Sequence, residues 1–568
     1  MKSTLIILLV LILGGLIRFD DLGDRTISHP EFYVPGLDVP DYVFHPNRRM
    51  TASEVFAAPY KIHHPHLPGY DLLMLGWVKV WGTEMSSIRA SSALFGTLAL
   101  LVMFLLARET INSKVAVLST SILAFHGHQI YWSQMAKQWV LLGLVGILTT
   151  FLISRLSKKW NPKSAIFYTL CSAFGLWIDS YFWPIFAAQI LWVLYNDSRR
   201  DHPSLILGLQ VIALLFASPA VSYLIRISSG ASHLPPELWP RILEMLQLGG
   251  MVIAGSTVKL IPAISIVAGI IGLVLLVQGV INKNTIQVSA YVDNSIIEKR
   301  LWKIILLCIP IVLVINVVIF RNENIIVHRR SLFYSTVFAL VVPAIWWLLR
   351  KKWNQFGSFA RKCMSVRQVS LVLSDLPSVM MLVPFLLLLP IHLMKPVYTP
   401  YALVTLAPFF ILVASRGVMS FSGFKRNILI AGIAALSIFS LVQSENIPDP
   451  TDYKLLANKL LPEISEGEIL LVDDKWYIVP VIYYFPPSKY MLYPSSVFID
   501  GAANIFTDMA GRKHSRFWLI DFVYDDKQKE DLRSRVILLQ KKYRKGKELR
   551  AKEGVAILFE NDRKINNN

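Results

Sequence analysis

Residues 85–107 read MSSIRASSALFGTLALLVMFLLA, and from Ala93 to Ala107 this stretch carries no charged side chain. A helix needs about 20 apolar residues to cross the hydrocarbon core of a bilayer, and about 17 to 25 are usual. The stretch therefore predicts a transmembrane helix. Twelve further apolar runs predict helices of the same kind, which makes thirteen: 4–17, 115–127, 138–154, 164–179, 181–195, 204–224, 258–281, 303–320, 331–349, 377–394, 400–415 and 427–443.

The composition of the whole chain agrees with a polytopic α-helical membrane protein. Of its 568 residues, 54% are hydrophobic and 17% are charged, and the mean hydropathy is +0.50. A soluble domain carries about a quarter charged residues, so these values exclude an ordinary cytosolic enzyme and a disordered chain. The three cysteines also exclude a disulfide-stabilised scaffold.

The formal net charge of +19 raises the question of a nucleic-acid partner. A nucleic-acid-binding protein gathers its basic residues on one domain, whereas here they are scattered between the apolar runs. Loops that face anionic lipid account for this pattern. We therefore expect membrane lipids, and no nucleic acid, among the partners.

The basic residues of the short loops also predict the orientation in a cell membrane. They gather in 155–163, 199–200 and 350–367, which the positive-inside rule places in the cytoplasm. With thirteen spans, the N-terminus is then cytoplasmic, and the first long loop (18–84) lies outside together with the C-terminal tail (444–568). The first run has no small-residue cleavage site, so we expect an uncleaved helix rather than a signal peptide.

The tail is a different kind of sequence from the transmembrane domain, which we assign to 1–443. Strand-like runs occupy 468–473, 517–521 and 555–559, and charged helical patterns cover 452–464 and 525–545. About 120 residues suffice for a small core. The sequence therefore predicts an extracytoplasmic α/β domain over 444–568.

The first outer loop, 18–84, is longer than a connection between two helices requires, so we expect a folded functional element. It carries Arg18 and Glu31 among other charged residues, followed by the histidines His63, His64 and His66. The spacing of these histidines is not that of a structural zinc site.

The order of these residues and of later ones resembles that of a known family. The matching positions are Arg18, Pro30-Glu31, the segment His64-Pro65-His66-Leu67-Pro68-Gly69-Tyr70, the pattern Ser87-Ile88-Arg89-Ala90-Ser91, the segment 130–139 (IYWSQMAKQW), and Pro396-Val397-Tyr398 with Tyr401. The chain resembles the GT-C superfamily of membrane glycosyltransferases, which includes protein O-mannosyltransferase-like proteins and the lipid A aminoarabinose transferase. The resemblance is dense over 18–155 and looser to 443. It implies a GT-C fold and a polyprenyl-phosphate sugar donor.

Four positions depart from the family pattern. Pro30 stands where the first acid of an Asp-Glu pair is usual, Met135 replaces a glutamate, Lys137 replaces an arginine, and Pro400 stands at the position of a late arginine. Two carboxylates that would be metal ligands in the family are therefore missing. The departures argue against a divalent-metal-dependent mechanism, and no other cofactor is implied.

The resemblance assigns candidate roles in an inverting displacement. Such a reaction needs a carboxylate to take the acceptor proton and positive charge at the departing phosphate. Glu31 is the candidate base, and the candidates for binding the donor phosphate or sugar are Arg18, His64, His66, Gln134 and Lys137. Lys137 also fits a lysine that snorkels at a helix end, and Arg18 also fits a residue that ends a short helix.

Two further features are polar residues outside the family pattern. Lys395, Arg329 and Arg330 lie in outer loops, against the inside-positive rule, which marks them as candidate phosphate contacts. Asp179 ends an apolar run next to Tyr181 and Trp183, and we interpret it as a polar end at the membrane interface beside an aromatic belt.

These observations predict an integral membrane glycosyltransferase that moves a sugar from a polyprenyl-phosphate donor to a lipid, glycan or protein acceptor on the extracytoplasmic face. A transporter or flippase of lipid-linked glycans is the first alternative, although the sequence has no internal repeat and few ionisable residues within its spans. A non-catalytic subunit with the GT-C fold is the second, because Pro30 and Met135 replace acids. The sequence identifies neither the sugar nor the acceptor.

Overall fold

The computed structural model divides the chain into two compact units. Unit 1 comprises Met1–Leu22, Ala52–Trp77 and Ser86–Ile447, and unit 2 comprises Gly23–Thr51, Val78–Met85 and Pro448–Asn568. The structure describes residues 2–23, 27–36, 51–61, 66–196, 203–229, 262–281, 295–320, 325–351, 372–394, 400–445, 453–472, 478–485, 489–494, 516–523, 526–541, 543–551 and 553–560.

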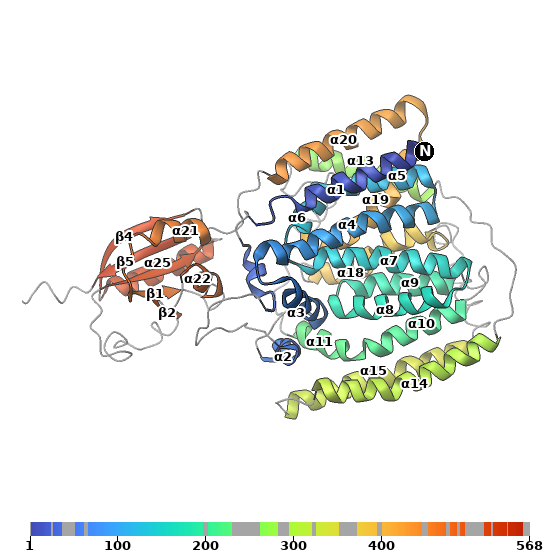
Figure 1. The fold of residues 1–568 in the computed structure, drawn as a ribbon, viewed down its shortest axis with the longest axis horizontal. Coiled ribbons are helices and arrows are strands. Elements are labelled where there is room, and N and C mark those ends of the chain that lie inside the picture. Colours follow the sequence, from blue (N-terminus) through green and yellow to red (C-terminus); the bar gives the residue numbers. More distant parts are fainter. Residues whose placement is uncertain are drawn as a thin grey trace, which may run out of the picture. The chain divides into compact units, whose positions relative to one another are not determined.

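Unit 1 is a bundle of helices (Figure 1). Its longer described helices are α1 (Lys2–Phe19), α3 (Pro68–Trp81), α4 (Met85–Thr110), α5 (Ser113–Ala124), α7 (Gln138–Lys158), α8 (Pro162–Ile178), α9 (Phe182–Tyr195), α10 (Pro203–Phe216), α11 (Ser218–Ser229), α13 (Pro262–Ile281), α14 (Ser295–Phe320), α15 (Ile325–Lys351), α18 (Leu376–Met394), α19 (Pro400–Ser420) and α20 (Gly423–Glu445). The shorter helices α2 (Ala52–Lys61) and α6 (Gly127–Ser133) join them. Each of the thirteen apolar runs falls on one or two of these helices.

Within the described residues, five helices are long and apolar enough to cross a membrane, and a bent pair brings the number to six. Other apolar helices, among them α5 and α9, are shorter. The prediction of a mainly helical, multi-pass membrane protein is confirmed, and the number of crossings stays a prediction.

The run 204–224 was expected to form one span, but it is two helices, α10 and α11, that meet at an angle of 56°. Pro219 lies in the first turn of α11. Proline has no N–H to donate to the carbonyl four residues before it. Its ring also clashes with that carbonyl, so a straight helix cannot continue through it. The bend at Ala217 follows from this chemistry.

Close helix packing in unit 1 relies on small residues and neutral hydrogen bonds. At Gly279 of α13, a Cβ atom would lie 2.9 Å from the Val413 side chain of α19, so only glycine lets these helices approach so closely. Deeper in the bundle, the Tyr168 hydroxyl donates to Gln189 at 3.0 Å, and Gln189 donates to Thr149 at 2.9 Å. These contacts join α7, α8 and α9 without a buried charge.

The outer helices of the bundle present apolar side chains away from the protein. Leu307 and Val314 of α14 are more than half exposed, as is Phe333 of α15. Apolar surface of this extent would be unfavourable in water, but it suits contact with lipid. The exposed faces of α14 and α15 therefore agree with a position at the edge of a membrane bundle.

Unit 2 contains a five-stranded sheet with the order β2-β1-β3-β5-β4. Its strands are β1 (Ile469–Val472), β2 (Met491–Pro494), β3 (Arg516–Phe522), β4 (Arg544–Arg550) and β5 (Gly554–Glu560). Strand β1 is parallel to β2 and β3, whereas β5 is antiparallel to β3 and β4. The three strand-like runs of the tail are thus strands β1, β3 and β5.

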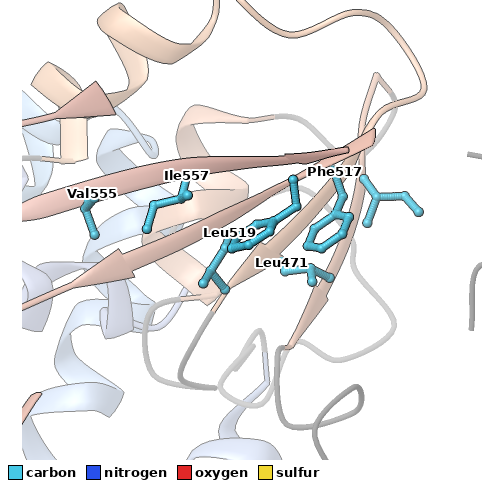
Figure 2. Close-up of a cluster of buried hydrophobic side chains, with 7 residues drawn as sticks. Leu471, Phe517, Leu519, Val555 and Ile557 are labelled. Carbon is cyan, nitrogen blue, oxygen red and sulfur yellow. The ribbon is translucent and has the colours of Figure 1, made fainter. Parts of the chain in front are cut away.

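Alternate side chains of the sheet form two apolar faces, as expected for extended strands. On one face, Leu471, Phe517, Leu519, Val555 and Ile557 form a buried cluster (Figure 2) together with Ile469 and Phe559. Leu532 and Val536 of helix α25 (Asp526–Gln540) cover this cluster. On the other face, helix α21 (Tyr453–Leu460) packs against the sheet through Tyr453, whose ring lies 4.4 Å from that of Phe522.

A segment from the first long loop also belongs to unit 2. It forms the short 3-10 helix η1 (His29–Tyr33), and Phe32 at its centre is buried. The Phe32 ring meets Tyr453 of α21 and Tyr483 and Tyr484 of helix α22 (Ile478–Tyr484). Unit 2 therefore combines the C-terminal part of the chain with a segment that lies far before it in sequence.

Candidate functional site

The candidate residues of unit 1 lie where several helices begin or end. Arg18, in the last turn of α1, is buried and donates hydrogen bonds to the Leu123 and Ala124 carbonyls, both at 2.9 Å. These carbonyls belong to the last turn of α5, where unpaired C=O groups and the helix dipole favour a cation. Arg18 therefore joins the ends of α1 and α5. Among the described residues, its Nε atom has no hydrogen-bond partner.

Gln134 makes the complementary contact at the end of α1. Its Nε2 donates to the carbonyls of Ile17 at 2.9 Å and Asp20 at 3.1 Å. Gln134 follows α6, so these bonds hold α6 against α1. Its Oε1 atom is buried without a hydrogen-bond partner in the part of the chain that the structure describes. Within the described residues, Arg18 and Gln134 thus each combine a helix-capping contact with one polar atom that has no hydrogen-bond partner.

Gly96 of α4 makes room for this arrangement. A Cβ atom at this position would lie 3.0 Å from Arg18 Nε and 3.0 Å from Ser133 Cβ, and closer still to Ser133 Oγ. Real Cβ atoms rarely approach so closely, so a larger residue would displace Arg18 or Ser133. The glycine is required by packing around the Arg18 guanidinium.

The Ser-x-Arg-x-x-Ser pattern has a structural role in the same region. Arg89 is buried, and its Nη1 donates to the Leu22 carbonyl at 3.0 Å. This bond ties the chain that leaves α1 to helix α4. Ser91 Oγ donates to the Ile88 carbonyl of its own helix at 2.7 Å. The pattern therefore fixes the start of the first long loop.

Lys137 is the residue that begins α7. Its backbone is extended, which is usual for an N-cap, and its side chain is largely buried with 9% of the residue exposed. A snorkelling lysine keeps its ammonium in water, so the burial of Lys137 argues against the interpretation as a snorkelling residue. Lys137 directly precedes Gln138, the first residue of α7. The Gln138 side chain belongs to a polar group of unit 1.

That group consists of His66, Gln138 and Asp179. Gln138 Nε2 lies 3.0 Å from His66 Nδ1 and donates to Asp179 Oδ2 at 3.1 Å. His66 Nδ1 and Asp179 Oδ2 are 3.6 Å apart. Gln138 and Asp179 are buried, whereas the His66 side chain is 27% exposed. The three elements that meet here are the start of α3, the start of α7 and the end of α8.

The other oxygen of Asp179 is held by the chain that follows it. Asp179 Oδ1 accepts hydrogen bonds from the Ser180 hydroxyl and the Tyr181 N–H, both at 3.1 Å. A buried carboxylate with four polar neighbours has a fixed orientation. This arrangement replaces our interpretation of Asp179 as a simple polar end at the interface.

The donor and acceptor roles in the contact between Gln138 Nε2 and His66 Nδ1 depend on the tautomer of the ring. In the tautomer in which Nδ1 accepts a hydrogen bond from Gln138, Nε2 carries the proton. In the imidazolium form both nitrogens carry protons. In either state Nε2–H is a donor of the kind that binds a phosphate or sugar oxygen.

Glu31 lies in unit 2, within η1. It is fully buried, and its Oε2 accepts hydrogen bonds from the Ser28 N–H and the Ser28 hydroxyl, both at 2.9 Å. The Glu31 N–H donates to the Ser28 carbonyl at 2.9 Å. This is a capping box, in which a serine and the acid three residues later satisfy the first turn of a helix. The local sequence therefore fixes the orientation of the carboxylate.

Two of the other sequence-predicted residues, His64 and Lys395, lie outside the described part of the chain, and the same holds for the side chain of Arg329. Arg330 is exposed and lies in α15, so the expectation of a loop at this position is wrong. Among the described residues, no group of three or more His, Cys, Asp or Glu side chains is arranged to hold a metal ion. The structure places Arg18 and Gln134 at the end of α1, and it brings His66 together with Gln138 and Asp179.

Gln138 and Asp179 were not among the site residues chosen from the sequence. Both flank features that were recognised, since Gln138 follows Lys137 and Asp179 ends an apolar run. A carboxylate that interrupts apolar sequence at a helix end is a signal for a buried, paired group. The partner could not be chosen, because His66 is 113 residues before Asp179 in the chain.

Residues 63–223 match the family model described as "Dolichyl-phosphate-mannose-protein mannosyltransferase". Over these residues the chain is similar to that family, which agrees with the resemblance to the GT-C superfamily expected from the sequence. The match and the apolar helices support a multi-pass membrane protein. No curated protein matches the chain in sequence.

Solved structures give low overall similarity. ArnT from Cupriavidus metallidurans in the apo state is 12% identical with a TM-score of 0.38, and 98% of each chain is covered. The same protein bound to undecaprenyl phosphate is 11% identical with a TM-score of 0.35, and 97% of each chain is covered. The Archaeoglobus fulgidus oligosaccharyltransferase in complex with Zn and sulfate is 11% identical with a TM-score of 0.42, over 90% of this chain and 68% of that one.

Proposed function

We propose that the protein transfers a sugar from a polyprenyl-phosphate donor to a lipid, glycan or protein acceptor on the extracytoplasmic face of the membrane. The observation that carries this proposal is the His66–Gln138–Asp179 group, in which a buried carboxylate fixes a partly exposed histidine at the helix ends that also carry Lys137. Such a combination of donors and positive charge suits a lipid phosphate. The proposal also includes a transmembrane domain that ends near residue 443. The domain that follows it, 444–568, lies on the extracytoplasmic side.

In the proposed reaction, an acceptor hydroxyl or amide attacks the anomeric carbon of the sugar as the carbon–oxygen bond to the phosphate breaks. A carboxylate oxygen of Glu31 takes the acceptor proton, and the polyprenyl phosphate leaves with the bonding electron pair. One displacement inverts the anomeric centre. Glu31 suits this role because its capping box holds the carboxylate in one orientation.

Positive charge and hydrogen-bond donors stabilise the leaving phosphate. His66 Nε2–H and the Lys137 ammonium supply them, and Asp179 with Gln138 keeps the imidazole oriented. Interactions with a group that gains charge in the transition state lower the barrier most. We assign His64 to the same function on the resemblance alone, and Lys395 because it breaks the inside-positive rule in an outer loop.

Arg18 and Gln134 have a more limited proposed role. Most of their donors bind backbone carbonyls at the ends of α1 and α5, so they shape the site first. The Arg18 Nε–H is the donor that a phosphate oxygen or an ordered water would meet, because it is buried and has no hydrogen-bond partner among the described residues. Replacing Arg18 would therefore affect both folding and donor binding.

The rival functions make different demands on the same residues. A flippase would depend on polar groups within the membrane, and the Tyr168–Gln189–Thr149 network gives that reading its best candidate. A non-catalytic subunit would bind the donor without transferring its sugar. Neither rival transfers a sugar, so neither requires Glu31 as a base.

Sugar transfer by the purified full-length protein in nanodiscs tests the proposal. Radiolabelled polyprenyl-phosphate sugars serve as donors, and a membrane extract supplies the acceptors. We expect transfer by the wild type and a fall of at least about 10²-fold in Glu31→Gln, the lower range for loss of a general base. Glutamine can keep the capping box, so this variant separates chemistry from folding.

Two outcomes would change the proposal. Transfer that survives Glu31→Gln would retain the enzyme class and remove Glu31 as the base. Donor binding without transfer from any donor would favour the non-catalytic subunit. An EDTA-treated sample decides whether a divalent metal takes part.

A further inference from the structure

The C-terminal part of unit 2 holds the segment that carries Glu31. Phe32, the next residue, is 2% exposed, and its ring centroid lies 5.8 Å from that of Tyr453, 5.5 Å from Tyr483 and 6.3 Å from Tyr484. All three pairs meet edge to face, the arrangement that aromatic quadrupoles favour. One side chain of η1 is thus surrounded by three rings that lie more than 400 residues later in the chain.

The three tyrosines are themselves fixed by the domain. Tyr453 is buried, and its ring lies 4.4 Å from that of Phe522 at the end of β3. Tyr483 and Tyr484 lie 5.2 Å apart on α22. A continuous series of ring contacts therefore runs from the central strand β3 through Tyr453 to Phe32.

Local contacts alone would leave η1 weakly positioned. A single turn of five residues is far too short to be stable by itself. The capping box orients the Glu31 carboxylate relative to Ser28, but it does not place the turn in space. The contacts of Phe32 supply this second constraint, because they dock the turn on α21 and α22.

We infer that Phe32 is a positioning residue for sugar transfer, and that the C-terminal domain controls the reaction by clamping Glu31 through the aromatic group of Phe32, Tyr453, Tyr483 and Tyr484. The inference rests on the proposed role of Glu31 as the base. It gives the domain a function in the chemical step. A partner or acceptor that moved α21 or α22 would change the position of Glu31 as well.

The test compares Phe32→Leu with Tyr543→Leu in the full-length protein. Both variants replace a ring that packs edge to face in unit 2, but Tyr543 contacts Phe517 on the other face of the sheet. We expect Phe32→Leu to lower kcat by about 10-fold to 10²-fold with little change in the KM for the donor, as misplacement of a reacting group does. Tyr543→Leu should retain the wild-type kcat.

The double variant Glu31→Gln/Phe32→Leu separates positioning from general damage. If Phe32 acts through Glu31, the double variant transfers sugar no more slowly than Glu31→Gln alone. Losses that multiply would overturn the inference. Tyr483→Phe and Tyr484→Phe keep the rings, so they should retain most of the activity, whereas the corresponding leucine variants should not.

Hydrogen exchange of residues 27–36 reports the clamp without activity. We expect faster exchange there in Phe32→Leu than in the wild type or Tyr543→Leu. Unchanged exchange together with unchanged kcat would overturn the inference while Glu31→Gln still tests the proposed function. Full activity of Glu31→Gln would instead overturn the role of Glu31 and, with it, that of the clamp in catalysis.

Discussion

Two carboxylates in the two units are held in different ways. In unit 1, Asp179 is fixed by Gln138, 41 residues away in sequence, and by His66, so its surroundings are polar and assembled from separate helices. In unit 2, Glu31 is fixed by Ser28, three residues away, and its turn is then docked through aromatic packing at Phe32. The bundle orients Asp179 with hydrogen bonds from residues far away in sequence. Unit 2 orients Glu31 with a hydrogen-bonded neighbour in the same turn, and the apolar contacts of Phe32 hold that turn.

The difference follows from the surroundings of each unit. Lipid tails are as apolar as the side chains of a membrane helix, so burial of apolar surface does not by itself favour contact between helices. Hydrogen bonds and close packing of small residues therefore determine which helices associate. In unit 2, burial of apolar side chains from water provides the main stabilising free energy. The two units should therefore respond differently to the same class of substitution.

The largest effect is expected in the sheet of unit 2. Leu519 is 1% exposed in the cluster beneath α25, and Leu519→Ala should cost about 2–5 kcal/mol through lost burial and the cavity left behind. Denaturation followed by hydrogen exchange should show the strands of unit 2 opening at lower denaturant while the helices of unit 1 keep their protection. Equal loss of protection in both units would contradict the comparison.

In unit 1, the corresponding test is the removal of a polar partner. Asp179→Ala leaves Gln138 Nε2 without its buried acceptor, and we expect a loss of about 1–3 kcal/mol in unfolding free energy. Asp179→Asn keeps an acceptor oxygen and should cost less. Thermal unfolding in detergent measures both variants, and an alanine variant as stable as the asparagine variant would argue against the hydrogen-bonded group.

Close packing around Arg18 gives a third test. In Gly96→Ala, the added methyl would press on Arg18 and Ser133, with an expected cost of about 1–3 kcal/mol from overpacking. Gly76→Ala is the matched control, since a Cβ there meets nothing within 4 Å. It should be neutral or stabilising by about 0.5–1 kcal/mol in its helix. If both variants had the same thermal midpoint, Gly96 would not be required by packing.

The smallest effect is expected at an exposed ion pair of β4. The hydrogen bond from Lys545, at 2.7 Å, lowers the pKa of Glu548 more than its partial burial raises it, and Arg550 lowers it further. A lowered pKa in the folded state means that this pair stabilises the fold above the ordinary glutamate pKa, and that the contribution is lost as the pH falls below about 4. Glu548→Gln should therefore lower the thermal midpoint slightly at pH 7, by at most about 1 kcal/mol in free energy. The difference should vanish near pH 3, and a difference that grew on acidification would contradict the assignment.

Sequence reasoning reached the local features of this molecule and missed the long-range ones. The thirteen apolar runs fall on helices because hydropathy along the chain determines which segments can be helical in a membrane. The bend after Phe216 was missed, although Pro219 carries the signal for it. The pairing of Asp179 with His66, and of Phe32 with Tyr483, depends on how distant segments pack, and no local pattern specifies that.

The residues of the candidate site also divide into those with a local sequence signal and those that depend on distant contacts. Glu31 and Ser28 form a pattern that can be read directly, since an acid three residues after a serine is typical of a capping box. The interpretation of Arg18 as a residue at a helix end is supported by its bonds to the α5 carbonyls. Gln138 was not chosen, because nothing in the sequence around an amide next to a lysine indicates a site. Its role becomes visible only when the fold places His66 and Asp179 beside it.

The most direct test of the account measures donor binding and transfer in the same samples of Glu31→Gln and Asp179→Asn. The account predicts that Glu31→Gln binds a radiolabelled polyprenyl-phosphate sugar like the wild type but transfers it at least about 10²-fold more slowly. It predicts that Asp179→Asn weakens donor binding by about tenfold, equivalent to about 1.4 kcal/mol, because His66 loses its charged partner. Transfer by Glu31→Gln at the wild-type rate, or unchanged donor binding by Asp179→Asn, would contradict the division of roles between the two carboxylates.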